Sequence, residues 1–156
     1  MSDLDNLLIE AMKSELEAKK FYEDASIKAQ SQAGKKLFKE LAEFEQNHYE
    51  CVKNIIELRT NNMEIQTPDV TTQDISIKPE IEGEIESNKD EIITVLNMAI
   101  DAEIKAQERY RRLANLFDDE ESKKIFFNLS QDERNHQRIL EDEIYQLSNK
   151  GTIIWE

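Results

Sequence analysis

The chain contains two copies of one pattern, because its halves align without a gap when the sequence is shifted by 88 residues. Between Leu4 and Leu58, 13 of 55 positions are identical in the second copy. The shared apolar residues recur at steps of three and four, which is the spacing of a buried stripe along a helix. Each copy carries two such stripes separated by a turn. The repeat therefore predicts an all-α protein built from two helical hairpins.

The bounds of the hairpins follow from the stripes and from the residues that interrupt them. The first hairpin is predicted over about residues 3–59 and the second over about residues 88–148. Residues 60–87 hold both prolines and are predicted to form a long connection. Residues 149–156 form a short tail that is expected to dock on the bundle or on a partner chain. We expect a single domain over residues 1–156, a four-helix bundle whose hairpins are joined by a long crossover.

Turn and cap residues mark the expected ends of the helices. The first turn is predicted near residues 31–34. The second is predicted near Asp118, which has Glu121 three residues later, as in a capping box. Ser87, with Asp90 three residues later, is expected to cap the third helix in a similar way. Gly151 suits the end of the fourth helix, because glycine readily adopts the left-handed conformation found there.

Charge and composition narrow the classes of partner. The chain has 34 acidic and 20 basic residues, which gives a formal net charge of −14. So acidic a chain is a poor binder of nucleic acid or of an anionic membrane surface. No apolar stretch reaches the roughly 18 residues of a membrane span, and the N-terminus has no signal-peptide pattern, so we expect a cytoplasmic protein. The single cysteine, Cys51, excludes an intramolecular disulfide and a cysteine-rich metal site; we expect it to be a small core residue.

Charged residues interrupt the apolar stripes near the middle of each helix. Four glutamates occupy positions where the spacing requires a buried apolar residue: Glu15, Glu45, Glu103 and Glu133. Burying an unpaired carboxylate costs several kcal/mol or more. The only two histidines, His48 and His136, each follow a stripe glutamate by three residues and so lie on the same helix face. The alanines next to Glu15 and Glu103 in the stripes leave room for something other than a side chain.

Two divalent metal ions would compensate this buried charge. Four carboxylates carry −4 and two neutral imidazoles carry none, so two such ions close the layer neutral. Glutamate oxygens and histidine nitrogens suit iron, manganese or zinc. One glutamate from each of two helices and Glu-x-x-His from the other two is the di-iron carboxylate pattern of four-helix bundles. The alternative is a pair of core histidines whose partners are the neighbouring carboxylates.

Two tyrosines repeat beside the expected site. Tyr22 and Tyr110 lie seven residues after Glu15 and Glu103, two turns along the same face. They are either core aromatics or donors that orient the ligating carboxylates and tune the metals. The seam of alanine, leucine and isoleucine indicates no cavity for an organic substrate.

These motifs resemble the rubrerythrin and ferritin-like di-iron superfamily. The resemblance is carried by Glu15-x6-Tyr22 with Glu45-x2-His48, and by their copies Glu103-x6-Tyr110 with Glu133-x2-His136. It implies a ferritin-like bundle that holds two iron ions. It further implies that Glu45 and Glu133 bridge the irons, that Glu15 and Glu103 are terminal ligands, and that both histidines are ligands.

The sequence departs from rubrerythrins in two places. It lacks the paired Cys-x-x-Cys motifs of a rubredoxin domain, so electrons would come from another protein such as a rubredoxin. It also has Ala106 where rubrerythrins carry an extra carboxylate on the third helix. The symmetric six-residue set is closer to bacterioferritin and to short, single-domain rubrerythrin-like proteins.

The expected function is reduction of hydrogen peroxide or dioxygen at the dinuclear iron site, with electrons from an external donor. One alternative is ferritin-like oxidation of Fe²⁺ with iron storage or delivery. Another is a non-catalytic domain that binds manganese or zinc. A homodimer is compatible with the sequence, including one in which hairpins are exchanged, because a long crossover permits such a swap.

Overall fold

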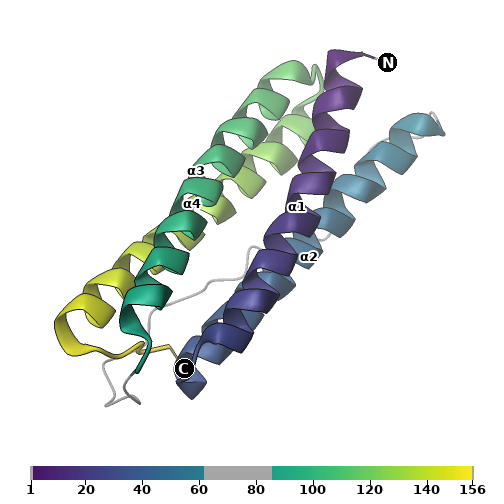
Figure 1. The fold of residues 1–156 in the computed structure, drawn as a ribbon. Helices are drawn as coiled ribbons and strands as arrows, with labels where there is room; N and C mark the ends of the chain where they lie inside the picture. Colours follow the sequence, from purple (N-terminus) through teal and green to yellow (C-terminus); the bar gives the residue numbers. More distant parts are fainter. Residues whose placement is uncertain (1, 62–85, 156) are drawn as a thin grey trace.

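The fold is a bundle of four long helices in two hairpins (Figure 1). The computed structural model describes residues 2–61 and 86–155. The first hairpin is α1 (Asp3–Lys28) with α2 (Gln32–Thr60), and the second is α3 (Lys89–Leu116) with α4 (Glu120–Lys150). The prediction of an all-α four-helix bundle is confirmed.

The direction of the helices fits a long crossover between the hairpins. α2 ends at one end of the bundle and α3 begins at the other, so these two helices run parallel (Figure 1). α1 packs on α2, α3 packs on α4, and α1 contacts α3 across the two hairpins. Most of the predicted connection of residues 60–87 lies outside the described residues. None of the described helices is long and apolar enough to cross a membrane.

Side-chain caps begin three of the helices. The Ser2, Ser31 and Asp119 side chains each accept a hydrogen bond from the backbone N–H three residues later. Gly151 ends α4 in the left-handed conformation, with φ of 70°, as expected. The predicted cap at Asp118 is wrong by one residue, because it is the Asp119 carboxylate that accepts from the Ser122 backbone at 2.9 Å.

The expected cap at Ser87 is also corrected. The residue that precedes the first turn of α3 is Asn88, and its side chain makes no capping hydrogen bond. Its amide instead donates to the Lys28 backbone carbonyl at the end of α1, at 2.9 Å. Asn88 therefore ties the start of the second hairpin to the first.

The apolar core is divided into two clusters. One contains Leu37, Phe38 and Leu96 toward one end of the bundle, and the other contains Leu8 and Phe126 toward the other end. The glutamates and histidines of the stripes lie between the clusters along every helix. The core thus closes the bundle on both sides of a charged layer.

The C-terminal tail packs on the bundle. α4 extends to Lys150, two residues beyond the predicted end of the hairpin. After the turn at Gly151, the side chains of Ile153, Ile154 and Trp155 are buried. The Ile154 backbone N–H donates to Glu143 of α4 at 3.3 Å, and the Trp155 indole N–H donates to Glu40 of α2. The tail therefore contacts both hairpins.

Candidate metal centre

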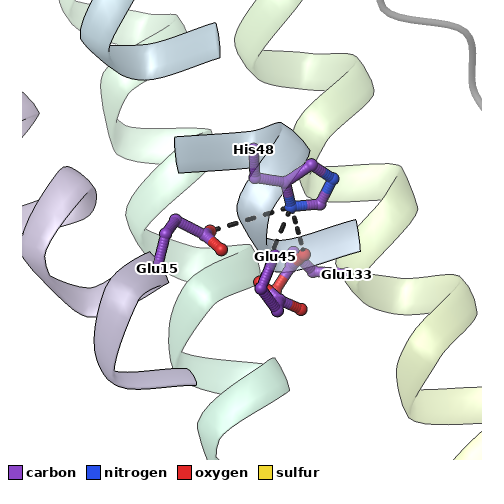
Figure 2. A group of neighbouring side chains, drawn as sticks. All are labelled: Glu15, Glu45, His48 and Glu133. Atoms are coloured by element: carbon purple, nitrogen blue, oxygen red, sulfur yellow. Dashed lines mark ion pairs between the residues drawn. The ribbon is translucent and has the colours of Figure 1, made fainter. Parts of the chain in front are cut away.

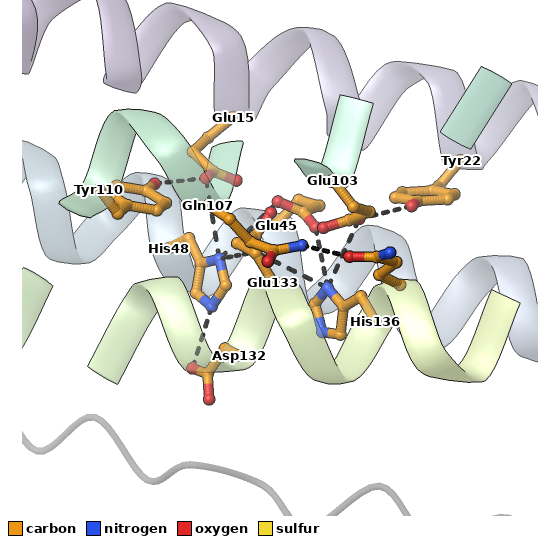
Figure 3. Close-up of polar contacts among 11 residues, drawn as sticks. Glu15, Tyr22, Glu45, His48, Glu103, Gln107, Tyr110, Asp132, Glu133 and His136 are labelled. Atoms are coloured by element: carbon orange, nitrogen blue, oxygen red, sulfur yellow. Dashed lines mark hydrogen bonds and ion pairs between the residues drawn. The ribbon is translucent and has the colours of Figure 1, made fainter. Parts of the chain in front are cut away.

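The structure brings all six sequence-predicted ligands together in the middle of the bundle (Figure 3). α1 and α3 each supply one glutamate, while α2 and α4 each supply a glutamate and a histidine. Every one of these side chains is at most 2% exposed. The six are Glu15, Glu45, His48, Glu103, Glu133 and His136. The helical repeat places them at one level because each lies near the midpoint of its helix.

The six side chains form two overlapping groups that could each hold a metal ion. One is Glu15, Glu45, His48 and Glu133, which Figure 2 shows; the other is Glu45, Glu103, Glu133 and His136. Within each group the candidate ligand atoms lie within 4.8 Å of one another. Glu45 and Glu133 belong to both groups. This sharing matches a pair of ions with two carboxylates between them.

Both histidines direct Nδ1 toward the carboxylates. Nδ1 of His48 lies 2.8 Å from Oε1 of Glu133 and 3.7 Å from the nearest oxygens of Glu15 and Glu45. Nδ1 of His136 lies 3.3 to 3.6 Å from oxygens of Glu45, Glu103 and Glu133. The two rings stack with centroids 6.0 Å apart. The same ring nitrogen of each histidine is therefore available to the layer.

Many polar atoms of this layer have no hydrogen-bond partner among the described residues. They are Oε2 of Glu15 and Glu103, both carboxylate oxygens of Glu45, Oε1 of Glu133, and Nδ1 of both histidines, although Nδ1 of His48 lies within ion-pair distance of Oε1 of Glu133. Buried polar atoms are normally paired, because leaving one unpaired costs about 1–3 kcal/mol. So many unpaired acceptors converging on one point fit a cation-binding site. Oxygen and imidazole donors of this kind suit iron, manganese or zinc.

The electrostatics of the carboxylates support the same fit. Burial and the charge of Glu45 raise the pKa of Glu15 well above its usual value. Burial and the charges of Glu103 and Glu45 raise the pKa of Glu133 well above its usual value. Burial opposes ionisation of Glu45, but the neighbouring Glu15 carboxyl group and both histidines outweigh it and hold the pKa of Glu45 well below its usual value. Without metal, the layer therefore retains protons that divalent cations would displace.

The two histidines are pushed toward their charged form. Burial lowers the pKa of His48, but the charge of Glu133 and the hydrogen bond with Asp132 outweigh burial and raise it well above its usual value. Burial also opposes ionisation of His136, and the nearby Glu103 carboxylate raises its pKa to about 10. Protonated histidines take the place that metal cations would fill among the carboxylates.

The two tyrosines reach across the hairpins to the glutamates. The Tyr22 hydroxyl of α1 donates to Oε1 of Glu103 on α3 at 2.6 Å. The Tyr110 hydroxyl of α3 donates to Oε1 of Glu15 on α1. Burial and the charges of these carboxylates raise the pKa of both phenols well above the usual value. Each hydroxyl thus remains a donor and fixes one oxygen of a candidate ligand.

Two polar residues beside the site were not predicted from the sequence. Asp132 is 5% exposed, and its Oδ2 lies 3.3 Å from Nε2 of His48. Gln107 donates its side-chain amide to Gln137 at 2.7 Å, next to the carboxylates (Figure 3). Asp132 lies on α4 and reaches a histidine of α2, so spacing within one helix gives no sign of the contact.

A cavity of about 350 Å³ opens onto the glutamates between α1 and α3. Its walls include Ala18, Ala99, Ala102 and Ala106, and Glu15, Glu45, Glu103 and Glu133 line it as well. The expectation of no substrate cavity is therefore wrong. The reason is that small residues face one another across two helices, which a reading of each stripe alone does not show.

Comparison with known proteins agrees with this geometry. A solved structure of a hypothetical protein from Pyrococcus furiosus is similar, with a TM-score of 0.76 and 28% sequence identity over 96% of this chain and 93% of that chain. No curated protein matches the chain. The sequence profile described as Rubrerythrin matches residues 6–143, which span all four helices from near the start of α1 into α4. The chain belongs to the rubrerythrin family.

Proposed function

We propose that the chain is a di-iron oxidoreductase that reduces hydrogen peroxide or dioxygen with electrons from an external donor such as a rubredoxin. The observation that carries the proposal is the buried layer of four glutamates and two histidines with unpaired ligand atoms. A pair of iron ions bound there would pass two electrons to the oxidant and regain them from the donor.

The six residues of the layer would be divided as ligands between the two metal ions. Glu15 and His48 would serve one ion, Glu103 and His136 the other, and Glu45 and Glu133 both. Four carboxylates balance the charge of two divalent ions, so the loaded layer would be neutral inside the core. Iron is the metal proposed, and manganese or zinc would fit the same donors.

The surrounding residues would give the oxidant access and keep the ligands in place. The alanine-lined cavity between α1 and α3 reaches the glutamates and is far larger than a peroxide or dioxygen molecule needs. Tyr22 and Tyr110 each hold one oxygen of a terminal glutamate by hydrogen bonding. The apolar clusters on either side of the layer would limit the access of water from the ends of the bundle.

The test is anaerobic loading with Fe²⁺, a count of the bound metal, and then one equivalent of peroxide or of dioxygen. We expect two irons per chain and a near-ultraviolet change that develops faster with peroxide than with dioxygen. Glu45→Ala and His136→Ala should each lose bound iron. Two irons bound with unchanged affinity in either variant would contradict the assigned site.

The same experiment separates the other functions. A faster reaction with dioxygen and continued uptake of iron beyond two per chain would support ferritin-like iron oxidation and storage instead. Tight binding of zinc or manganese with no consumption of either oxidant would support a non-catalytic metal domain. The first result would make Fe²⁺ the substrate in place of an external electron donor, and the second would overturn the proposed reduction of the oxidant.

A further inference from the structure

The two halves of the centre share their glutamates, histidines and tyrosines, but they differ in the residue that contacts the outer side of each histidine. A shift of 88 residues pairs Asp132 on α4 with Phe44 on α2, immediately before the two glutamates shared by both groups. Each of these residues contacts the histidine of the opposite hairpin. Asp132 contacts His48, and Phe44 contacts His136. The second hairpin therefore has a carboxylate, and the first an aromatic ring, at equivalent positions beside the two histidines.

The outer nitrogens of the two histidines consequently have different surroundings. Nε2 of His48 lies 3.3 Å from the buried Asp132 carboxylate (Figure 3). The His136 ring instead meets the Phe44 ring edge-on, with centroids 5.1 Å apart and an interplanar angle of 75°. Nε2 of His136 has no hydrogen-bond partner within residues 2–61 and 86–155. An aromatic ring has no lone pair that could accept a normal hydrogen bond from it.

This difference bears directly on metal binding. A carboxylate that accepts from Nε2–H keeps the proton on that nitrogen and leaves the Nδ1 lone pair free for a metal. The carboxylate also fixes the ring orientation and makes the imidazole more basic. His136 has no such partner, so metal binding there must also fix the tautomer and the orientation of the ring, which lowers the net binding free energy. Asp132 further adds one negative charge beside the His48 group only.

We propose that Asp132 makes the His48 group the higher-affinity metal position, which fills first, and that Phe44 leaves the His136 group the more readily exchanged one. The inference rests on the proposed function, because it assumes that both groups bind metal. Asp132 acts through His48 and is a positioning residue. The metal beside His136 would be the one that leaves and returns more easily.

The test uses anaerobic titration of the full chain with Co²⁺, whose visible absorption reports occupancy. His136→Ala isolates the His48 group, and His48→Ala isolates the His136 group. We expect His136→Ala to bind Co²⁺ at least about tenfold more tightly than His48→Ala does, which is the low end of the effect of such partners. Adding Asp132→Leu should remove that advantage in the first background and leave the second unchanged.

Two further variants and a spectrum keep the test independent of folding defects. Asp132→Asn retains an oxygen acceptor and should restore part of the affinity that Asp132→Leu loses. Phe44→Asp supplies a carboxylate at the equivalent place and should tighten binding in the His48→Ala background. In proton NMR of the Co²⁺-loaded protein, one shifted histidine N–H resonance should exchange slowly, and Asp132→Leu should abolish it. A loss of fold alone would not remove this signal from a protein that still binds Co²⁺.

The outcomes distinguish the two proposals. If the unaltered protein binds neither Fe²⁺ nor Co²⁺, the metal centre itself is wrong. If it binds two ions but the two single-histidine variants have equal affinity, or Asp132→Leu leaves the stronger position unchanged, only the inequality of the two positions is overturned.

Discussion

Tyr22 and Tyr110 each donate a hydrogen bond to a glutamate of the opposite hairpin, Glu103 and Glu15. Each hydroxyl donates to one carboxylate oxygen, and the other oxygen of that carboxylate has no partner among the described residues. This leaves one oxygen of each glutamate oriented and the other free. Each tyrosine hydroxyl therefore orients a candidate ligand by a hydrogen bond, as Asp132 does for His48.

Replacing either tyrosine by phenylalanine should weaken metal binding without removing the site. Partners of metal ligands typically contribute about 10- to 100-fold to affinity, so Tyr22→Phe and Tyr110→Phe should each lose Fe²⁺ affinity in that range. The measurement is competition with a chelator under anaerobic conditions. Tyr145→Phe is the matched control, because Tyr145 is 64% exposed and lies away from the layer. Equal affinity in all three variants would show that the hydroxyls only fill the core.

Spacing along the helices was sufficient to find the six candidate ligands but not their neighbours. A buried glutamate in an apolar stripe is visible in the sequence because it contradicts the pattern. Asp132 and Gln107 do not interrupt the stripes, and their partners, His48 and Gln137, lie on other helices. The alignment of the halves did contain a sign of Asp132, since it pairs a charged residue with Phe44 beside a conserved glutamate of the repeat.

Glu86 joins three segments at one end of the bundle. Its buried carboxylate accepts hydrogen bonds from the backbone N–H groups of Gln30 and Ser31 at 3.0 and 2.8 Å, just before α2. Its own N–H donates to the Gly151 carbonyl at 2.9 Å. A Cβ at Gly34 would lie 2.7 Å from Oε1 of Glu86, so glycine makes room for the carboxylate. Glu86 thereby supplements the Ser31 cap of α2.

Glu86→Ala should destabilise the bundle by about 1–3 kcal/mol, because the buried N–H of Ser31 and the partly buried N–H of Gln30 lose their acceptor. Urea unfolding followed by circular dichroism measures the change. Glu43→Ala provides the control, since Glu43 is exposed on α2 and should change the free energy of unfolding by less than about 0.5 kcal/mol. A similar loss in both variants would mean that the hydrogen bonds of Glu86 contribute nothing beyond ordinary helix effects.

Glu143 links α4 to the tail and gives the fold a dependence on pH. Burial raises the pKa of Glu143 to about 7, while the N–H of Ile154 opposes the rise. The folded state thus holds a proton that the unfolded state releases above its ordinary pKa of 4.5. Stability contributed by this group is full below that value, falls as pH rises toward about 7, and then stays low.

Glu143→Gln should therefore stabilise the protein at pH 8 by up to about 3 kcal/mol and have little effect near pH 4.5. The glutamine keeps an oxygen that accepts from Ile154 and carries no charge. The free energy of unfolding of both proteins, measured across this range, gives the difference that belongs to Glu143. A difference that does not change with pH would contradict the raised pKa.

The ends of the helices were harder to predict than their existence. Adjacent Asp118 and Asp119 are chemically equal as caps, and only the backbone conformation decides that Asp119 accepts from the next turn. The repeat already pairs Ser31 with Asp119, which would have selected the right residue. The predicted cap at Ser87 is wrong for another reason. α3 begins one residue later than predicted, and the Asn88 side chain donates to the first hairpin.

The two hairpins meet at the charged layer, and each candidate metal group takes side chains from both of them. The first group combines Glu15, Glu45 and His48 of the first hairpin with Glu133 of the second; the other combines Glu45 with Glu103, Glu133 and His136. Elsewhere α1 and α3 are separated in part by the cavity that opens onto the layer. Metal binding would therefore join the hairpins where their packing is interrupted.

Loading with metal should raise the stability of the entire bundle. A ligand that binds only the folded state at 100 times its Kd stabilises it by about 2.7 kcal/mol per site, so two sites should add roughly 5 kcal/mol. The Tm in the presence of Fe²⁺ or Co²⁺ without oxygen should exceed the Tm with a chelator, and the chelator should reverse the shift. An unchanged Tm in a protein shown to bind two ions would mean that the unfolded chain binds them equally well, and that the assembled layer is not the binding site.

Glu133→Gln separates the contribution of the metals from that of the carboxylates. Glu133 belongs to both groups, so its loss should abolish most of the metal-dependent rise in Tm.

Without metal, the effect of Glu133→Gln on stability should have the opposite sign. Burial and the charges of Glu103 and Glu45 raise the pKa of Glu133, so a neutral glutamine removes repulsion that the empty layer suffers. The variant should then match or exceed the metal-free parent, by about 1–3 kcal/mol at pH 8. A variant less stable than its parent without metal, and still stabilised by Co²⁺, would show that Glu133 pairs with His48 as a structural ion pair and that other residues hold the metals.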